Sequence, residues 1–248
     1  MDNSQFNAPF KEIIEFSGRL GKMVQSFDFA LPKLNFPEIK LPEFTLPEID
    51  FENIKASIEH NSKFGWTLTG PMGLALYFDK DLREMDQAQL DEYFYLLYTE
   101  KDFAFFNEIK EDLIGKIEPH RKELLEDCLD SFLSDKYKIA IPTLMTFIEG
   151  EVTDILDTRD YGWKLNELME KATTNDEEKF DQIATYSTYY FLREELYRSW
   201  KFGDERLEMI NRHWVLHGRD NPELWTKYDC LRLINVLSSL QFIKDDIE

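Results

Sequence analysis

The chain is most distinctive at residues 211–218, which carry the sequence NRHWVLHG and are followed by the turn RDNP. Two of its four histidines, His213 and His217, lie four residues apart in this stretch. Because successive residues of an α-helix are separated by about 100° around its axis, both imidazoles are expected on one face. Arg212 and His217 are five residues apart and should diverge by about 140° on one regular helix. Gly218 suits the position just after a helix, so we predict that a helix ends at His217.

These residue types suit acid–base chemistry on a phosphodiester. An imidazole exchanges a proton near neutral pH, and a guanidinium matches two phosphate oxygens. Two other interpretations stay open. His213 and His217 have the i, i+4 spacing of metal ligands, although residue 214 is tryptophan where the zinc-protease motif has glutamate. Arg212 and the two histidines could instead form a hydrogen-bonded cluster at a dimer interface.

The same stretch resembles the Arg-(four to six residues)-His motif of the HEPN superfamily. Arg212 and His217 match the two fixed positions, and His213 matches the polar residue that often follows the arginine. The order of the preceding segments is also similar: a Gly-Trp stretch, several helices, then YKIAIP at 137–142 and IEG at 148–150. The resemblance covers about residues 60–245 and leaves out the N-terminal region.

The resemblance, which is to HEPN proteins of bacterial abortive-infection and prophage genes, implies an all-α homodimer with one ribonuclease site formed by two copies. Arg212, His213 and His217 are its implied catalytic residues, with no metal and no cofactor. Glu149 is the implied acidic residue that orients the arginine or a histidine, and Asp154 is the second choice. The implied substrate is RNA, tRNA included, and not DNA, and the implied role is that of a toxin or anti-phage defence protein, with a protein partner or inhibitor.

The overall charge argues against this function. The chain has 29 Lys and Arg against 49 Asp and Glu, a net charge of −20, which opposes non-specific binding of nucleic acid. Arg212, His213, His217 and Arg219 form a local basic cluster that could offset it. The alternative is a catalytically degenerate HEPN-fold protein that senses or sequesters a phage protein or another partner.

A proline repeat near the N-terminus offers such a protein its contact surface. Residues 31–50 read LPKLN FPEIK LPEFT LPEID, with a proline every fifth residue. Each proline fixes its own φ and keeps the preceding residue out of the α region, so an extended arm is expected. Apolar residues at the first and fourth positions of each repeat predict a strap that docks on a surface. A short amphipathic helix is expected before it, from Pro9 to about Gln25.

Composition indicates a protein of the cytoplasm. Cys128 and Cys230 are too few for a disulfide framework and are expected to be reduced thiols. No apolar run is long enough for a membrane span, and the N-terminus does not have the pattern of a signal peptide. His60 and His120 lie among polar residues and are expected at the surface.

The fold class predicted is all-α: a helical bundle with a C-terminal HEPN-like domain and an extended proline-repeat arm. We divide the chain into the N-terminal helix and strap at 1–58, a helical module at 59–118 and the HEPN-like domain at 119–248. Trp66 should be buried in an irregular turn, and Asp86 should cap the helix that follows it. The helices are expected at 87–98, 103–117, 119–133, 137–156, 179–200 and 204–217, with a last helix from Asn221-Pro222. The apolar residues predicted for the core lie on four helices, at 119–133, at 137–156, at 204–217 and in the last helix. They are Leu124, Leu125, Cys128, Leu129, Phe132, Ile141, Leu144, Met145, Ile148, Val152, Ile155, Leu156, Leu207, Ile210, Trp214, Leu224, Tyr228, Leu231, Ile234 and Leu240.

Overall fold

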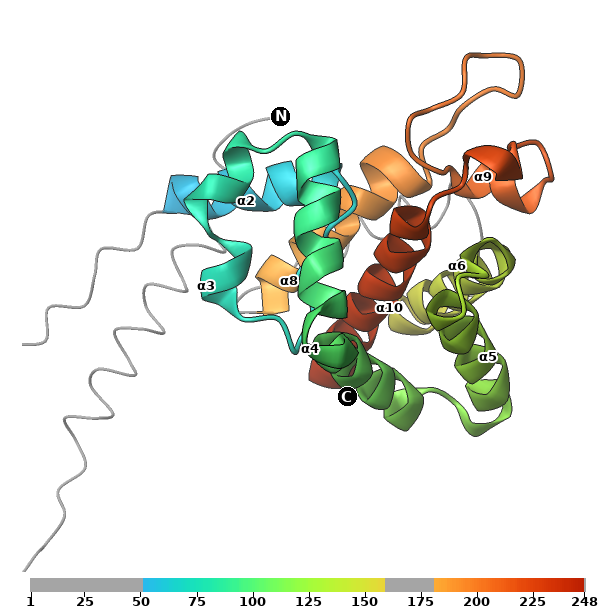
Figure 1. Cartoon of the computed structure of the whole chain (residues 1–248), viewed down its shortest axis with the longest axis horizontal. Coiled ribbons are helices and arrows are strands. Elements are labelled where there is room, and N and C mark those ends of the chain that lie inside the picture. The colour runs from blue at the N-terminus through green and yellow to red at the C-terminus, as the bar shows by residue number, and fades with distance from the viewer. Residues whose placement is uncertain (1–50, 159–180, 248) are drawn as a thin grey trace, which may run out of the picture.

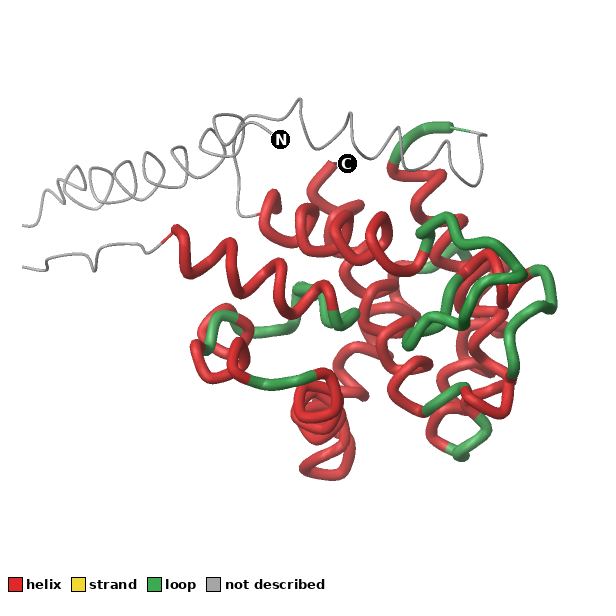
Figure 2. The backbone as a smooth tube through the Cα atoms, turned by 90° about the horizontal axis from the view of Figure 1, so that it is seen from above, coloured by secondary structure: helices red, strands yellow, loops and turns green. Residues whose placement is uncertain are grey.

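The computed structural model describes residues 51–158 and 181–247, and within them the protein is all-α (Figure 1). The eight α-helices of this part are α2 (Phe51–Lys63), α3 (Leu74–Tyr77), α4 (Gln87–Lys116), α5 (Lys122–Leu133), α6 (Tyr137–Ile155), α8 (Asp181–Phe191), α9 (Arg212–Leu216) and α10 (Lys227–Ile247). Single turns of 3-10 helix occupy Lys80–Glu84, Pro119–Arg121 and Pro222–Leu224, and a π-helical turn follows α8 at Leu192–Leu196. Figure 2 shows that loops join these helices, with no strand in the described part. The proline repeat and the helix expected before it lie outside the described residues.

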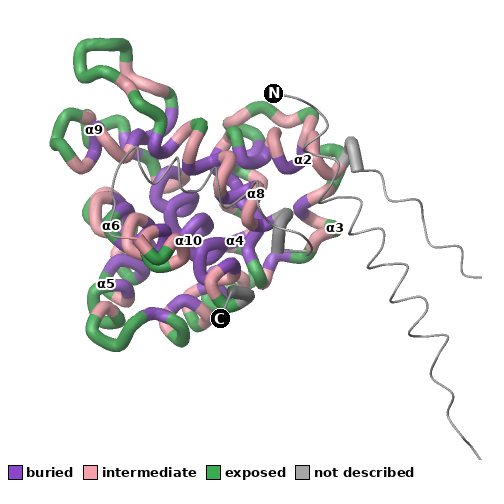
Figure 3. The backbone as a smooth tube through the Cα atoms, turned by 180° about the vertical axis from the view of Figure 1, so that it is seen from behind, coloured by how far each residue is buried: buried purple, intermediate pink, exposed green. Residues whose placement is uncertain are grey.

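Helix α10 forms the centre of the fold. Every residue from 229 to 241 is buried, and α4, α5, α6 and α8 all pack against this helix (Figures 1 and 3). The buried residues of the described part form one core, which includes Leu113 of α4 and Leu129 of α5. This core therefore continues across the boundary we placed between residues 118 and 119.

Buried polar groups join α10 to the irregular segment before α3. The Asn235 side-chain amide donates to the Thr67 carbonyl at 2.9 Å, and the hydroxyls of Thr67 and Ser239 lie 2.7 Å apart. Trp66 is fully buried and stacks on Phe94 of α4, with 4.7 Å between ring centroids. The predicted irregular turn with a buried tryptophan is confirmed.

An ion cluster connects α4, α10 and this turn. Arg232 on α10 pairs with Asp91 of α4 and, at 2.8 Å, with Asp229 one turn earlier. The Trp66 indole N–H also donates to Asp91, at 3.0 Å. Burial raises the pKa of Asp91 even though the Arg232 guanidinium opposes this shift. Gly65 permits the close approach, because its φ is +86° and a Cβ there would lie 2.5 Å from the Arg232 Cδ.

Several local predictions are confirmed. Asp86 caps α4 in a capping box with Gln89, and Pro119 opens the turn before α5. Non-helical backbone at residues 100–103 separates the two helices expected within α4. His120 is exposed and both cysteines are free thiols, as expected. None of the described helices has the length and apolar character needed to cross a bilayer.

The predicted helix at 204–217 is wrong in length. Residues 201–211 form turns and bends, and α9 begins only at Arg212. The Asn211 side chain explains this start, because it accepts hydrogen bonds from the backbone N–H groups of His213 and Trp214. The end of the helix is confirmed, since His217 is its C-cap and Gly218 has a φ of +65°. Of the residues expected inward, Ile210 and Trp214 are buried and Leu207 is half-buried.

Other predicted positions also need correction. Asn221-Pro222 starts a 3-10 turn, and the long α10 begins only at Lys227. Leu124 and Leu224 were expected in the core but are 51% and 53% exposed. Tyr228, Ile155 and Leu156 are only half-buried, while the other core positions predicted for α5, α6 and α10 are buried. His60, expected at the surface, is half-buried, and its ring donates to the Met85 carbonyl at 3.1 Å.

Candidate active site on helix α9

Helix α9 is held between two loops that extend from the same end of the bundle (Figure 1). The loop before it is fixed where the Asn211 amide donates to the Arg198 carbonyl at 2.9 Å and the Trp214 indole donates to the Trp200 carbonyl at 3.2 Å. The loop after it is fixed by Asp220, which accepts from Arg206 at 2.7 Å. Short contacts therefore order the surroundings of the two histidines.

The two imidazoles lie together, as their spacing predicted. The ring centroids of His213 and His217 are 4.6 Å apart with the planes at 65°. Phe202 stacks face to face on His213 at 4.5 Å and meets His217 edge-on at 5.9 Å. His217 is exposed and His213 is half-buried, so both rings remain reachable from solvent.

Burial lowers the pKa of His213, and the positive charges of His217 and Arg212 lower it further. This shift favours the neutral ring near pH 7, and a neutral imidazole can accept a proton. A neutral imidazole beside a second imidazole is an arrangement in which one ring can accept a proton while the other donates one.

Arg212 points away from this pair and toward α6. Its guanidinium forms an ion pair with Glu149, and the side chains are 16% and 21% exposed. The guanidinium carbon also lies 5.8 Å from the ring centroid of Tyr197. The Nε of Arg212 is buried and has no hydrogen-bond partner among the described residues. The contact expected between Glu149 and Arg212 is thus present, and its role in chemistry stays a prediction.

The second acidic candidate lies elsewhere. Asp154 contacts Lys244 of α10 at 3.4 Å. The neighbouring Glu151, which we did not single out, is fully buried between Lys244 and Arg121, each at 3.2 Å. Its position on the apolar stripe of α6 was the available signal. Gly150 is closely packed, because a Cβ there would lie 2.8 Å from the Arg121 guanidinium. These two residues therefore belong to the packing of α6.

The structure adds to this site one residue, Phe202, and one contact, that of Arg219 with Phe202, which the sequence reasoning did not give. Phe202 covers His213, and the guanidinium carbon of Arg219 lies 5.5 Å from the Phe202 ring centroid. Arg219 had been counted only as part of the basic cluster. Phe202 lies in a loop without periodicity, so no sequence pattern indicated its contact with a histidine eleven residues away.

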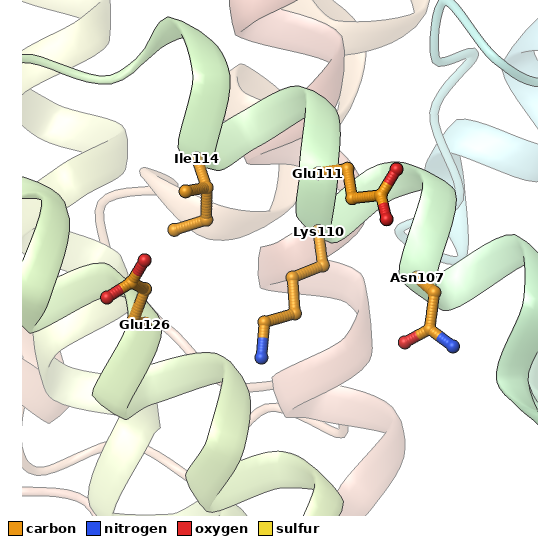
Figure 4. Close-up of a pocket in the computed structure, with 5 residues that line it drawn as sticks. All are labelled: Asn107, Lys110, Glu111, Ile114 and Glu126. Atoms are coloured by element: carbon orange, nitrogen blue, oxygen red, sulfur yellow. The ribbon is translucent and has the colours of Figure 1, made fainter.

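The described residues form no cluster of metal ligands, and the pocket found among them lies away from the candidate site. Within residues 51–158 and 181–247, no group of three or more His, Cys, Asp or Glu side chains could hold an ion. A shallow pocket lies between α4 and α5, lined by Asn107, Lys110, Glu111, Ile114 and Glu126 (Figure 4). None of the candidate site residues lines it.

Comparison of the chain with protein-family models, with curated proteins and with solved structures gives no match.

Proposed function

We propose that the protein is a metal-independent endoribonuclease of the HEPN type, acting in anti-phage defence or as a toxin. The observation that carries the proposal is the pair of accessible imidazoles, His213 and His217, with ring centroids 4.6 Å apart and a lowered pKa on His213. The Arg-x4-His motif that contains them and the all-α architecture also support it.

The proposed reaction is an attack of a ribose 2′-hydroxyl on the adjacent phosphorus. His213, neutral because of its lowered pKa, takes the proton of the 2′-hydroxyl as the bond from O2′ to phosphorus forms. The bond from phosphorus to the 5′-oxygen breaks, and His217 gives a proton to that oxygen. The products are a 2′,3′-cyclic phosphate and a 5′-hydroxyl, so atoms and charge balance without a metal.

Arg212 is proposed to stabilise the charge on the phosphorane-like transition state, and Glu149 is proposed to hold its guanidinium in position. Within one chain, Arg212 contacts Glu149 and Tyr197, whereas His217 contacts His213 and Phe202. A homodimer that pairs the α9 surfaces would place the arginine of one copy near the histidines of the other. Light scattering of the purified protein tests this part, and a monomer at assay concentration would contradict it.

A second candidate function is a binding protein that kept this fold without the chemistry. The net charge of −20 and the pairing of Arg212 with Glu149 favour it, because both reduce the positive potential offered to a phosphate. Its contact would be the proline strap at residues 31–50, with a phage or partner protein.

Incubation of total RNA and tRNA with the purified protein in EDTA tests the proposal. Wild type is expected to cleave and to leave 2′,3′-cyclic phosphate ends. The double variant Arg212→Ala/His217→Ala, purified in the same way, is expected not to cleave RNA. Its expression is expected to cause no growth arrest. Cleavage by both proteins would refute the catalytic role of Arg212 and His217, and cleavage by neither, without growth arrest, would favour the binding protein.

The pH dependence of cleavage tests which histidine is the base. Since the pKa of His213 lies below the ordinary value of about 6.5, this ring stays neutral until the pH falls through the lowered value. We therefore expect the acidic limb of kcat/KM to be centred below about pH 6.5. An acidic limb centred at or above about pH 6.5 would contradict the role of His213 as the base.

A further inference from the structure

The segment at residues 198–219 differs in charge from the rest of the chain. It contains five Lys and Arg against three Asp and Glu, in a protein whose net charge is −20. Two of its arginines, Arg206 and Arg212, are paired with Asp220 and Glu149. Arg219 is exposed and makes no ion pair within the part of the chain that the structure describes. A cation that is free to meet an anion therefore lies beside the candidate site.

Aromatic rings accompany the cations of this segment. Phe202 is 45% exposed and is the one aromatic residue among the large apolar side chains exposed in the described ranges. The guanidinium of Arg219 lies over its ring, and the guanidinium of Arg198 lies 4.8 Å from the ring centroid of Trp200. Exposed rings beside arginines are the elements that bind single-stranded nucleic acid, since bases stack on the rings and phosphates pair with the cations.

The surface is also ordered before a ligand arrives. The Trp200 indole donates to the Glu205 carbonyl at 2.7 Å, and the Arg206 guanidinium donates to the Leu207 carbonyl at 2.8 Å. Phe202 is itself fixed by stacking on His213. A fixed ring loses little conformational freedom on binding, so more of the stacking energy contributes to affinity.

We propose that Phe202 and Arg219 form a binding subsite for single-stranded RNA, in which a base stacks on the part of the Phe202 ring that His213 leaves exposed and the adjacent phosphate pairs with Arg219. This inference rests on the proposed function, because it names the part of the substrate held next to the two histidines. The chemistry favours RNA over a protein segment, because an exposed ring that can meet a base lies beside a cation that can pair with the adjacent phosphate. The contact of Phe202 with both imidazoles places the bound base next to the reacting phosphate.

Binding is measured separately from cleavage by fluorescence anisotropy with a labelled 2′-O-methyl oligoribonucleotide, which has no 2′-hydroxyl to react. Phe202→Leu, which keeps an apolar side chain without a π face, is expected to raise Kd by about tenfold, and Phe202→Trp is expected to keep wild-type affinity. Arg219→Gln is expected to reduce the slope of log K against log salt by about 0.7, the loss of one phosphate contact to a single strand. Lys122→Gln on α5, exposed and of the same charge change, should leave the slope unchanged.

Absence of binding by wild type, or a Kd for Phe202→Leu within about twofold of wild type, would overturn the subsite. An equal loss of affinity in Phe202→Leu and Phe202→Trp would also overturn the subsite, because an aromatic ring at position 202 would then not be enough for binding. Phe202 would serve only to support His213. Cleavage of unmodified RNA without binding that depends on Phe202 would leave the proposed nuclease intact and remove this inference. Binding that depends on Phe202, without cleavage of RNA, would support the subsite and contradict the proposed nuclease.

Discussion

His217→Ala is expected to slow RNA cleavage by about 10²- to 10⁴-fold, the contribution of one positioned acid–base group. The imidazole is exposed, and its contacts are with the rings of His213 and Phe202, so its removal should not disturb the core. The loss should therefore appear in kcat, with the melting temperature and the circular dichroism spectrum of wild type retained. Toxicity on expression should disappear with the same substitution.

His120→Ala is the matched control for this variant. His120 is exposed in the turn before α5 and takes no part in the ring cluster of α9. The His120→Ala variant should cleave RNA at the wild-type rate. Full activity of His217→Ala would refute the catalytic role of the motif, whereas equal losses in both variants would show that the assay responds to any loss of a histidine.

Arg232→Met is expected to lower the free energy of unfolding by about 3–5 kcal/mol, the usual effect of removing one partner of a buried ion pair. Methionine keeps the apolar stem that packs beside Gly65, but it leaves the carboxylates of Asp91 and Asp229 buried without their cation. Their side chains are 9% and 6% exposed, so water cannot replace the guanidinium. Urea denaturation followed by tryptophan fluorescence measures the change, with Trp66 in the same cluster.

Arg198→Met provides the comparison, because Arg198 is exposed and stacks only on Trp200 among the described rings. Its effect on stability should remain within about 0.5 kcal/mol. An effect of Arg232→Met below about 1 kcal/mol would contradict the importance assigned to the cluster, and would mean that Asp91 and Asp229 are protonated or reach solvent without the arginine.

The sequence predicted features that depend on neighbours along the chain. Asp86 and Gln89 define the start of α4 within a single turn, and the same reasoning placed the end of α9 at His217, just before Gly218. It failed for residues 204–211, where an apolar pattern suggested a helix but Asn211 caps α9 later in the chain. The local hydrogen bonds that the Asn211 side chain accepts from His213 and Trp214 overrode an approximate periodicity.

Contacts between segments that are far apart in the sequence were harder to predict than these local features. Glu149 was chosen through the resemblance and does lie against Arg212, 63 residues away. Phe202 could not be chosen, because an irregular loop has no period that specifies where its side chains point. The exposed Leu124 and Leu224 show the same limit: an apolar residue at a helical spacing is buried only if another element covers that face.

The sequence by itself determined the all-α character, most of the helix starts and ends, and the shared face of His213 and His217. Backbone hydrogen bonds and the repeat of the helix set these features within a few residues. The tertiary structure alone decided that α10 lies at the centre, that Arg232 is buried between two carboxylates, and that Phe202 packs on the histidines with Arg219 over its ring. These contacts join segments whose relative position depends on how the helices pack together, and the order of residues in any one segment does not specify that packing.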